Sequence, residues 1–426
     1  MIKFLKNNFL KIGTCFLVFL LPLQTRWIAN IEEVENTSNG YLSWGLYAVD
    51  VLVVLLLLFA IFYFKKNIFS KSFLLIFLIL SIVSLCVAPN KILVIQHAMW
   101  ILLAGGVSFL VSVFKDKTFL LGLFVFGLLI NAWLGIWQFF VQFSFANKWL
   151  GLSQHDPALP GTSIVEFYPF SQTTPVRWLR SYGSFDHPNI FGVMMLLGII
   201  IAIWLIIENG NKKNEKILLY FSLVSFSMAL FASFSRGAWM GLVFVGVFVF
   251  VRAYCQNSNK ALFKILKPVI ATIGVFAIMI FFYSEQFSMR SGGSGRLEQK
   301  SFSDRELYFQ QGKEIVSSNW FWGVGMGNYI EQIKINNPNN EVWNYQPVHN
   351  VPMLVLAETG IFGLLLFLMF LAFISFFAWQ NGTLAVSLII ALSPALMLDH
   401  WLWSSHFGFF CIGFIVGIIL NKRVTT

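Results

Sequence analysis

Charged residues are scarce in this chain of 426 residues: Asp, Glu, Lys and Arg make up 11% of it, whereas 58% is hydrophobic. Together with a mean hydropathy of +0.74, this composition excludes an ordinary soluble domain. The hydropathy predicts an all-α, polytopic membrane bundle that forms a single domain over residues 1–426. The net charge of +10 does not indicate nucleic-acid binding, because the lysines lie in short loops beside apolar runs.

Cysteine is also scarce, and its four copies lie in or next to apolar runs: Cys15, Cys86, Cys255 and Cys411. We therefore expect no structural disulfide and no cysteine-based metal site. The histidines lack the HExxH or Cys/His spacing of a zinc site. The GVGMGN segment resembles a dinucleotide-binding fingerprint only superficially, because it lacks the third glycine and follows a predicted helix. The sequence predicts neither a metal nor a cofactor.

Twelve apolar stretches approach the roughly 20 residues that a membrane-spanning helix needs. They lie at about 8–23, 44–64, 72–88, 93–114, 118–143, 188–208, 217–235, 237–252, 265–283, 351–378, 383–398 and 407–420. The start, MIKFLKNN, resembles a signal peptide. No small-residue cleavage site follows it, so we expect an uncleaved first span.

If the N-terminus is placed in the cytoplasm, the connecting segments on the cytoplasmic side contain more basic residues per residue than those outside. Examples are Lys65, Lys66, Lys212 and Lys213. This distribution predicts that both termini are cytoplasmic. Two long segments, 144–187 and 284–350, then lie outside. We expect the first to be irregular and the second to open with a flexible RSGGSGR stretch. A helix should follow from Ser303, because Ser303 and Glu306 form a capping-box pattern.

Three arginines lie at or between predicted spans, where a buried guanidinium is costly and is a functional candidate. Arg236 in FSRGAW is either an interfacial arginine that snorkels or an anion clamp flanked by small residues. Arg305 falls in the first turn of the predicted helix, where a cation is unfavourable unless an anion binds there. Arg180 in RSYGSFDHPN is the third candidate, and the planar fork of arginine suits phosphate.

His349 enters the tenth predicted span and is followed by Asn350; histidine suits a general base for a sugar hydroxyl. Glu358 lies nine residues further on, where a carboxylate is costly unless it is paired. A structural role is open for each, as it is for His187, whose neighbour Pro188 suits a helix start. We place His187, Asn350 and Glu358 among the candidate substrate-binding residues. We interpret Asp50 as a buried polar contact, and His400 and His406 as interfacial residues.

Five segments in order resemble the O-antigen ligase and polymerase superfamily of bacterial envelope enzymes: LPLQT, RSYGSFDHPNIFG, SRGAWMGL, NWFWGVGMGNY and HNVPMLVLAETGIFGLLLF. The family-like region covers about 180–375. The resemblance implies a GT-C-like helical membrane fold and metal-independent transfer of a glycan from undecaprenyl pyrophosphate to an acceptor outside the cytoplasmic membrane. It further implies that Arg236 and Arg305 hold the pyrophosphate, that Arg180 supports them, and that His349 acts as base or orients the acceptor.

Attack of an acceptor hydroxyl from the face opposite the leaving pyrophosphate predicts inversion. The acceptor stays open between lipid A core, a repeat unit, a protein and a wall polymer, so a ligase and a polymerase are both possible. A transporter or flippase is the alternative from another class, and it would place polar groups near mid-membrane. A non-catalytic scaffold is a third reading. Besides donor and acceptor, we expect membrane lipids as partners and no nucleic acid.

Overall fold

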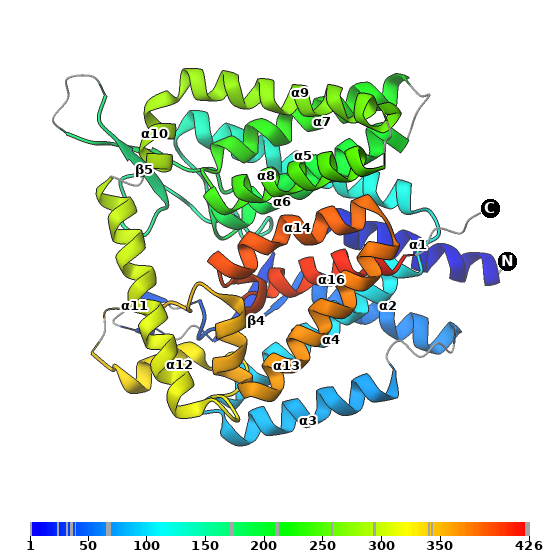
Figure 1. Cartoon of the computed structure of the whole chain (residues 1–426). Coiled ribbons are helices and arrows are strands. Elements are labelled where there is room, and N and C mark those ends of the chain that lie inside the picture. The colour runs from blue at the N-terminus through cyan, green and yellow to red at the C-terminus, as the bar shows by residue number, and fades with distance from the viewer. Residues whose placement is uncertain are drawn as a thin grey trace.

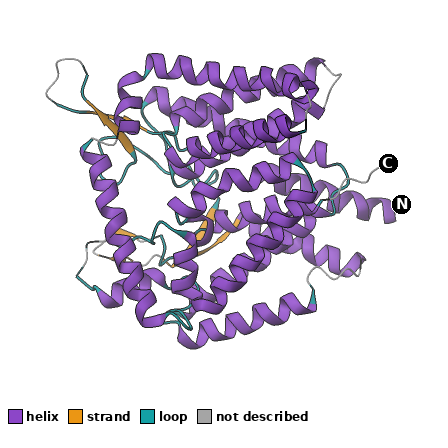
Figure 2. Ribbon diagram, in the orientation of Figure 1, coloured by secondary structure: helices purple, strands orange, loops and turns teal. Residues whose placement is uncertain are grey.

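The computed structural model describes residues 2–421 apart from a few short segments. The segments left out are 24, 31–32, 35–36, 39, 65–69, 170–173, 209–212, 257–258, 293–294, 340 and 342–343. Helices dominate the described part (Figure 2). The predicted all-α membrane fold is confirmed.

Each of the twelve predicted apolar stretches contains a helix, although residues 44–47 of the second stretch form a strand. The corresponding helices are α1 (Ile2–Leu20), α2 (Ala48–Phe64), α3 (Lys71–Val87), α4 (Lys91–Ser112), α5 (Lys117–Val141), α6 (Pro188–Glu208), α7 (Lys213–Ala232), α8 (Arg236–Cys255), α9 (Asn259–Phe282), α13 (Val351–Gln380), α14 (Thr383–Leu398) and α16 (His406–Leu420). Among the described residues, α4 to α9 and α13 contain the seven stretches long and apolar enough to cross a membrane. The other five are shorter, so the number of spans stays a prediction.

Helix α6 forms the centre of the bundle and is the most deeply buried of the candidate spans. It packs along α7, α5 and α8, while α4 lies along α16 and α14 lies along α8. Gly192 lets α6 press against the turn between α7 and α8. A Cβ at Gly192 would lie 2.7 Å from both Ser233 Oγ and Ser235 Cβ. This close approach fixes the turn that carries Arg236.

Three polar helices lie at the end of the molecule opposite both termini (Figure 1). They are α10 (Ser284–Gly292), α11 (Arg296–Asn319) and α12 (Tyr329–Asn336). In Figure 1, α11 runs between the helices above it and α12 below. The short helix α15 (Trp401–Ser404) joins α14 to α16.

Short antiparallel strand pairs complete the same end. Strand β1 (Arg26–Asn30) pairs with β4 (Trp44–Tyr47), β2 (Glu33–Val34) pairs with β3 (Thr37–Ser38), and β5 (Ile164–Phe167) pairs with β6 (Val176–Leu179). The β5–β6 hairpin contacts α10. The expectation that 144–187 is irregular is therefore wrong for this hairpin, whose four β5 residues are all buried.

Two predictions about 290–306 are also wrong. Helix α11 begins at Arg296, seven residues before the predicted start, and Ser303 donates its hydroxyl to Lys300 O at 2.9 Å within that helix. Ser303 is therefore no N-cap, and Arg305 lies in the third turn. Residues 290–292 of RSGGSGR belong to α10, and the guanidinium of Arg290 is anchored in the protein; residues 293–294 of this stretch lie outside the described residues.

Gly360 interrupts α13 with a φ of 67°. A Cβ there would lie 2.1 Å from Phe321 O, so the glycine permits close contact with the turn after α11. Ile361 N donates to Trp320 O at 2.9 Å across this contact. The kink therefore joins the end of α11 to the helix that follows His349.

Candidate functional site

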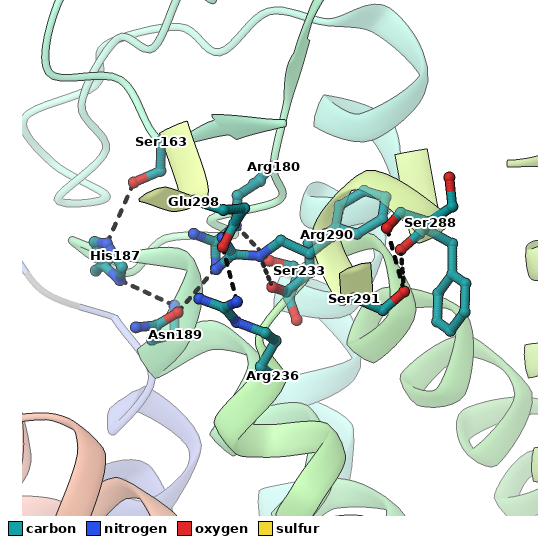
Figure 3. A network of polar contacts seen from close by, with 12 residues as sticks. Ser163, Arg180, His187, Asn189, Ser233, Arg236, Ser288, Arg290, Ser291 and Glu298 are labelled. Carbon is teal, nitrogen blue, oxygen red and sulfur yellow. Dashed lines mark hydrogen bonds and ion pairs between the residues drawn. The ribbon is translucent and has the colours of Figure 1, made fainter. Parts of the chain in front are cut away.

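Four arginines gather where α6, α8, α10 and α11 meet, and we call them the arginine cluster: Arg180, Arg236, Arg290 and Arg305. Figure 3 shows the first three around the carboxylate of Glu298, which comes from α11. Arg305 is near enough to Arg236 and Glu298 to interact with them electrostatically. Among the described residues, four cations thus surround one glutamate, and the cluster carries an excess of positive charge.

The turn between α7 and α8 organises this cluster through its carbonyl groups. Arg180 Nε donates to Ser233 O at 2.8 Å, and Arg290 Nε donates to Phe234 O at 2.9 Å. Phe234 has a φ of 48°, which is unusual for a residue other than glycine. Ser235 then caps α8 by accepting from Ala238 N, and Arg236 follows as its first residue. Two arginines therefore brace the turn that presents a third.

Glu298 neutralises only part of the charge. Its Oε2 lies 2.8 Å from Arg236 Nη1, and its Oε1 accepts from Arg290 Nη1. Arg236 Nη2 is nevertheless buried without a hydrogen-bond partner, and its guanidinium lies 5.2 Å over the ring of Phe302. Arg305 makes no hydrogen bond or ion pair with any described residue. These two side chains have donors left for a ligand.

Burial makes these charges costly. It lowers the pKa of Arg180 well below its usual value, with Arg290 as the next contribution. Burial likewise lowers the pKa of Arg305, while Asp399 acts in the opposite direction. Guanidinium groups stay protonated in proteins, so the shifts mean that the cluster is incompletely compensated. An anion bound there would be strongly favoured.

Beside the arginine cluster lies a second group, the histidine–aspartate cluster, formed by His349, Asp399 and His400. Asp399 precedes α15, and His349 precedes α13. The ring of His349 lies 4.9 Å from that of His400 and 5.9 Å from that of Tyr308 on α11, between centroids. His349 Nδ1 is buried and has no hydrogen-bond partner.

The carboxylate of Asp399 is fixed by donors on both oxygens. Oδ2 accepts from Asn189 Nδ2, and Oδ1 accepts from His400 N, each at 2.8 Å. Asn189 also accepts from Arg180 Nη2 at 2.8 Å. A continuous polar chain therefore runs from Arg180 through Asn189 to Asp399 and joins the two clusters.

Electrostatics favour a neutral His349 facing an ionised Asp399. Burial lowers the pKa of His349, and the neighbouring Asp399 counteracts part of this shift. Although burial opposes ionisation of Asp399, the facing imidazoles and the Asn189 hydrogen bond lower its pKa to about 2. Burial also lowers the pKa of His400 to about 3. A neutral imidazole beside a carboxylate is able to accept a proton at neutral pH.

The same three side chains could serve as metal ligands, because their ligand atoms all lie within 4.8 Å of one another. Two imidazoles and one carboxylate suit a transition metal. The neighbouring Arg305 and Arg180, however, repel a cation, and both oxygens of Asp399 already accept hydrogen bonds. We therefore interpret this group as a proton-transfer site.

The comparison with protein families now identifies the segment that carries most of these residues. The family model described as O-Antigen ligase matches residues 220–368, from α7 into α13. The chain carries an O-antigen ligase domain. The resemblance inferred from the motifs is thereby confirmed, whereas a comparison with curated proteins finds no match.

The O-antigen ligase domain contains three of the arginines and His349, but not the whole site. Arg180 and Asn189 precede the matched residues, and Asp399 and His400 follow them. The fold brings these flanking residues to the domain through α6 and the connection between α14 and α15. The site is therefore assembled from the domain and both of its flanks.

Three sequence candidates use their polar atoms within the fold. His187 contacts Ser163 Oγ at 3.2 Å through Nε2 and accepts from Asn189 N at 3.1 Å through Nδ1. Asn350 caps α13 by accepting from Met353 N at 2.9 Å. Glu358 accepts from Gly327 N and Trp403 Nε1, each at 2.8 Å, which holds the turn after α11. The structure thus gives all three an architectural contact.

His400 and His406 are both buried within the protein, and their position at the membrane interface stays a prediction. His406 Nε2 lies 2.7 Å from Asp50 Oδ1, so the interpretation of Asp50 as a buried polar contact is confirmed. All four cysteines are unpaired in the structure.

Sequence reasoning missed Arg290, Glu298 and Asp399. Arg290 was hidden by the glycines that follow it, which suggested flexibility. Glu298 precedes the misplaced helix start. Asp399 did offer a signal, because an Asp-His pair between two apolar runs is costly in a membrane unless it has partners.

Proposed function

We propose that the protein is a membrane glycosyltransferase that moves a glycan from undecaprenyl pyrophosphate to an acceptor hydroxyl. The observation that carries the proposal is the juxtaposition of unsatisfied cationic donors on Arg236 and Arg305 with a neutral histidine, His349. Membership of the matched segment in the O-antigen ligase family supports this reaction class. We place the site on the outer face of the bacterial cytoplasmic membrane, with both termini in the cytoplasm.

The arginine cluster would bind the pyrophosphate of the donor. Arg236 Nη2 has no partner, and Arg305 has none among the described residues, so both can donate to phosphate oxygens without breaking a contact. Guanidinium groups match phosphate with parallel hydrogen bonds. Arg180 and Arg290 would support them by holding the turn before α8 and by adding positive charge.

The histidine–aspartate cluster would handle the proton. His349 accepts the proton of the acceptor hydroxyl while the hydroxyl oxygen forms a bond to the anomeric carbon of the donor glycan. The bond from that carbon to the pyrophosphate breaks, and its electron pair leaves with the pyrophosphate. Asp399 stabilises the imidazolium that forms. Because attack and departure occur on opposite faces, the reaction inverts the anomeric configuration.

Charge stabilisation by arginine makes a metal unnecessary in this mechanism. Pyrophosphate is already a good leaving group, and preorganised donors at a partly dehydrated site are effective at stabilising developing charge. A polymerase that joins lipid-linked repeat units would use the same chemistry with a different acceptor. Either reaction would serve the synthesis of lipopolysaccharide or another surface polysaccharide.

The test is glycan transfer by purified protein in detergent or nanodiscs. Undecaprenyl-pyrophosphate oligosaccharide would be supplied with either a lipid A core acceptor or a second lipid-linked repeat unit. Product mass separates ligation from polymerisation, and the anomeric configuration reports inversion. Activity should persist after EDTA treatment.

The matched variants are Arg305→Ala and Arg296→Ala on the same helix. Arg296 is largely exposed and pairs with Glu166 at 2.7 Å, and it does not belong to the arginine cluster. Loss of undecaprenyl pyrophosphate release in Arg305→Ala, but not in Arg296→Ala, supports the proposal. Equal activity of both variants would contradict the assignment of the site. Flux of intact donor across liposome membranes without glycan transfer would favour a flippase.

A further inference from the structure

A second arginine of α8, Arg252, lies in a groove far from the proposed catalytic site. Arg252 lies 16 residues after Arg236, which corresponds to about 24 Å along a helix at 1.5 Å per residue. This spacing approaches the roughly 30 Å thickness of the hydrocarbon core. Both arginines belong to one candidate span. Arg252 therefore lies at the opposite membrane face from the arginine cluster.

Arg252 lines an apolar groove of about 880 Å³, and Cys255 and Gln256 line it further along the same chain segment. Val243, Phe244, Val247 and Val251 line its α8 side, and Trp379 comes from the end of α13. Helix α14 packs against both α8 and α13, the two helices whose residues line the groove. The lining from Val243 to Arg252 rises about 14 Å, close to the depth of one lipid leaflet.

The guanidinium of Arg252 is held in place without an acidic partner. It lies 5.4 Å from the centroid of Trp379 and 5.9 Å from that of Phe248. Its Nε is buried and has no hydrogen-bond partner, and none of the ion pairs found among the described residues includes Arg252. Two aromatic rings thus orient a guanidinium for which the described residues provide no hydrogen-bond or ion-pair partner.

We propose that this groove binds an anionic phospholipid of the leaflet opposite the catalytic site. The phosphate would accept hydrogen bonds from Arg252, and one acyl chain would lie along Val251, Val247 and Val243. Charge complementarity favours an anionic lipid over a zwitterionic one, because a bound ammonium group would meet the guanidinium. The tryptophan at the groove end suits the headgroup region.

Native mass spectrometry of the full-length protein tests this proposal. The probes are dioleoyl phosphatidylglycerol and dioleoyl phosphatidylcholine, which share their acyl chains and differ in headgroup. Wild-type protein should prefer the anionic lipid about fivefold, the effect of one basic side chain near an anionic lipid surface. Arg252→Gln should abolish that preference, and Arg252→Lys should retain part of it.

The matched control is Lys264→Gln, which removes an exposed positive charge near the start of α9, outside the groove. It should keep the fivefold preference, with an unchanged melting temperature for every variant. If Lys264→Gln and Arg252→Gln lost the lipid preference equally, general surface charge would explain the preference, and the proposal would be overturned. Displacement of the phospholipid by uncharged undecaprenol would overturn it in favour of the donor's hydrocarbon tail.

Discussion

The two sides of the site differ in how far the fold satisfies their charges. On the arginine side, four guanidiniums face one glutamate, and Arg236 and Arg305 keep unused donors. On the histidine side, both oxygens of Asp399 are hydrogen-bonded and fixed. One side is therefore prepared to gain an anion, and the other is prepared to hold a proton acceptor in position.

This difference separates the two parts of the proposed reaction. Binding of the leaving group depends on incomplete compensation, because a fully paired arginine would have to lose a partner first. Proton transfer depends on complete compensation of the carboxylate, because a mobile Asp399 would not hold its charge beside His349. Substitutions on the two sides should consequently differ in kind as well as in size.

The largest effect is expected for Arg236→Ala. Loss of one preorganised donor at developing charge lowers the rate constant by about 100–1000-fold. Arg236→Lys should recover part of the loss, because lysine keeps the charge without the fork. Initial rates of pyrophosphate-lipid release measure this, and Arg296→Ala is the control. A loss of less than threefold would contradict the role of the arginine side.

His349→Ala should follow, with a loss of about 100-fold from removal of the general base. Donor binding should stay unchanged, because the arginine cluster is intact. The measurement is single-turnover transfer at saturating donor, combined with a donor binding curve. Weaker donor binding with an unchanged single-turnover rate would contradict the role of His349 as the general base and would indicate a role in donor binding instead.

Asp399→Asn should lower the rate by about tenfold and move the acid limb of the pH profile. In the wild type, burial lowers the pKa of His349, so activity should fall only below the ordinary histidine range, as His349 becomes protonated. Asp399 raises that pKa, so its removal should move the limb to still lower pH. A change of one unit in the pKa of His349 corresponds to a tenfold change in its proton-binding equilibrium constant. A limb that stays in place or moves upward would argue against this pairing.

The smallest effect on transfer is expected for Glu358→Ala, outside both sides. The substitution leaves Gly327 N and Trp403 Nε1 without their acceptor, at a cost of ~1–3 kcal/mol for each unsatisfied group. The melting temperature should fall by several degrees while the folded fraction keeps its specific activity. Wild-type stability combined with lost transfer would return Glu358 to the substrate-binding set.

The sequence predicted the helical bundle well, because long apolar runs leave a membrane chain few alternatives. It also predicted Arg236, Arg305 and His349 as site candidates, since their cost in a membrane marks them. It misplaced the start of α11, because a capping-box pattern at Ser303 occurs inside a longer polar helix.

The partners of these residues were harder to find. Arg290 on α10 meets Glu298 on α11, eight residues further on, through their side chains. Asp399 meets Asn189 across 210 residues. Local patterns do not encode such contacts, and the flanks that supply Asn189 and Asp399 lie outside the O-antigen ligase domain.

Donor binding tests the central claim most directly. Undecaprenyl pyrophosphate and undecaprenol share a hydrocarbon chain, and their affinities would be compared on wild-type protein and on the double variant Arg236→Ala, Arg305→Ala. The account predicts that the wild type binds the pyrophosphate at least tenfold more tightly, that the double variant loses this preference, and that undecaprenol binds both equally. An unchanged pyrophosphate preference in a folded double variant would contradict the account.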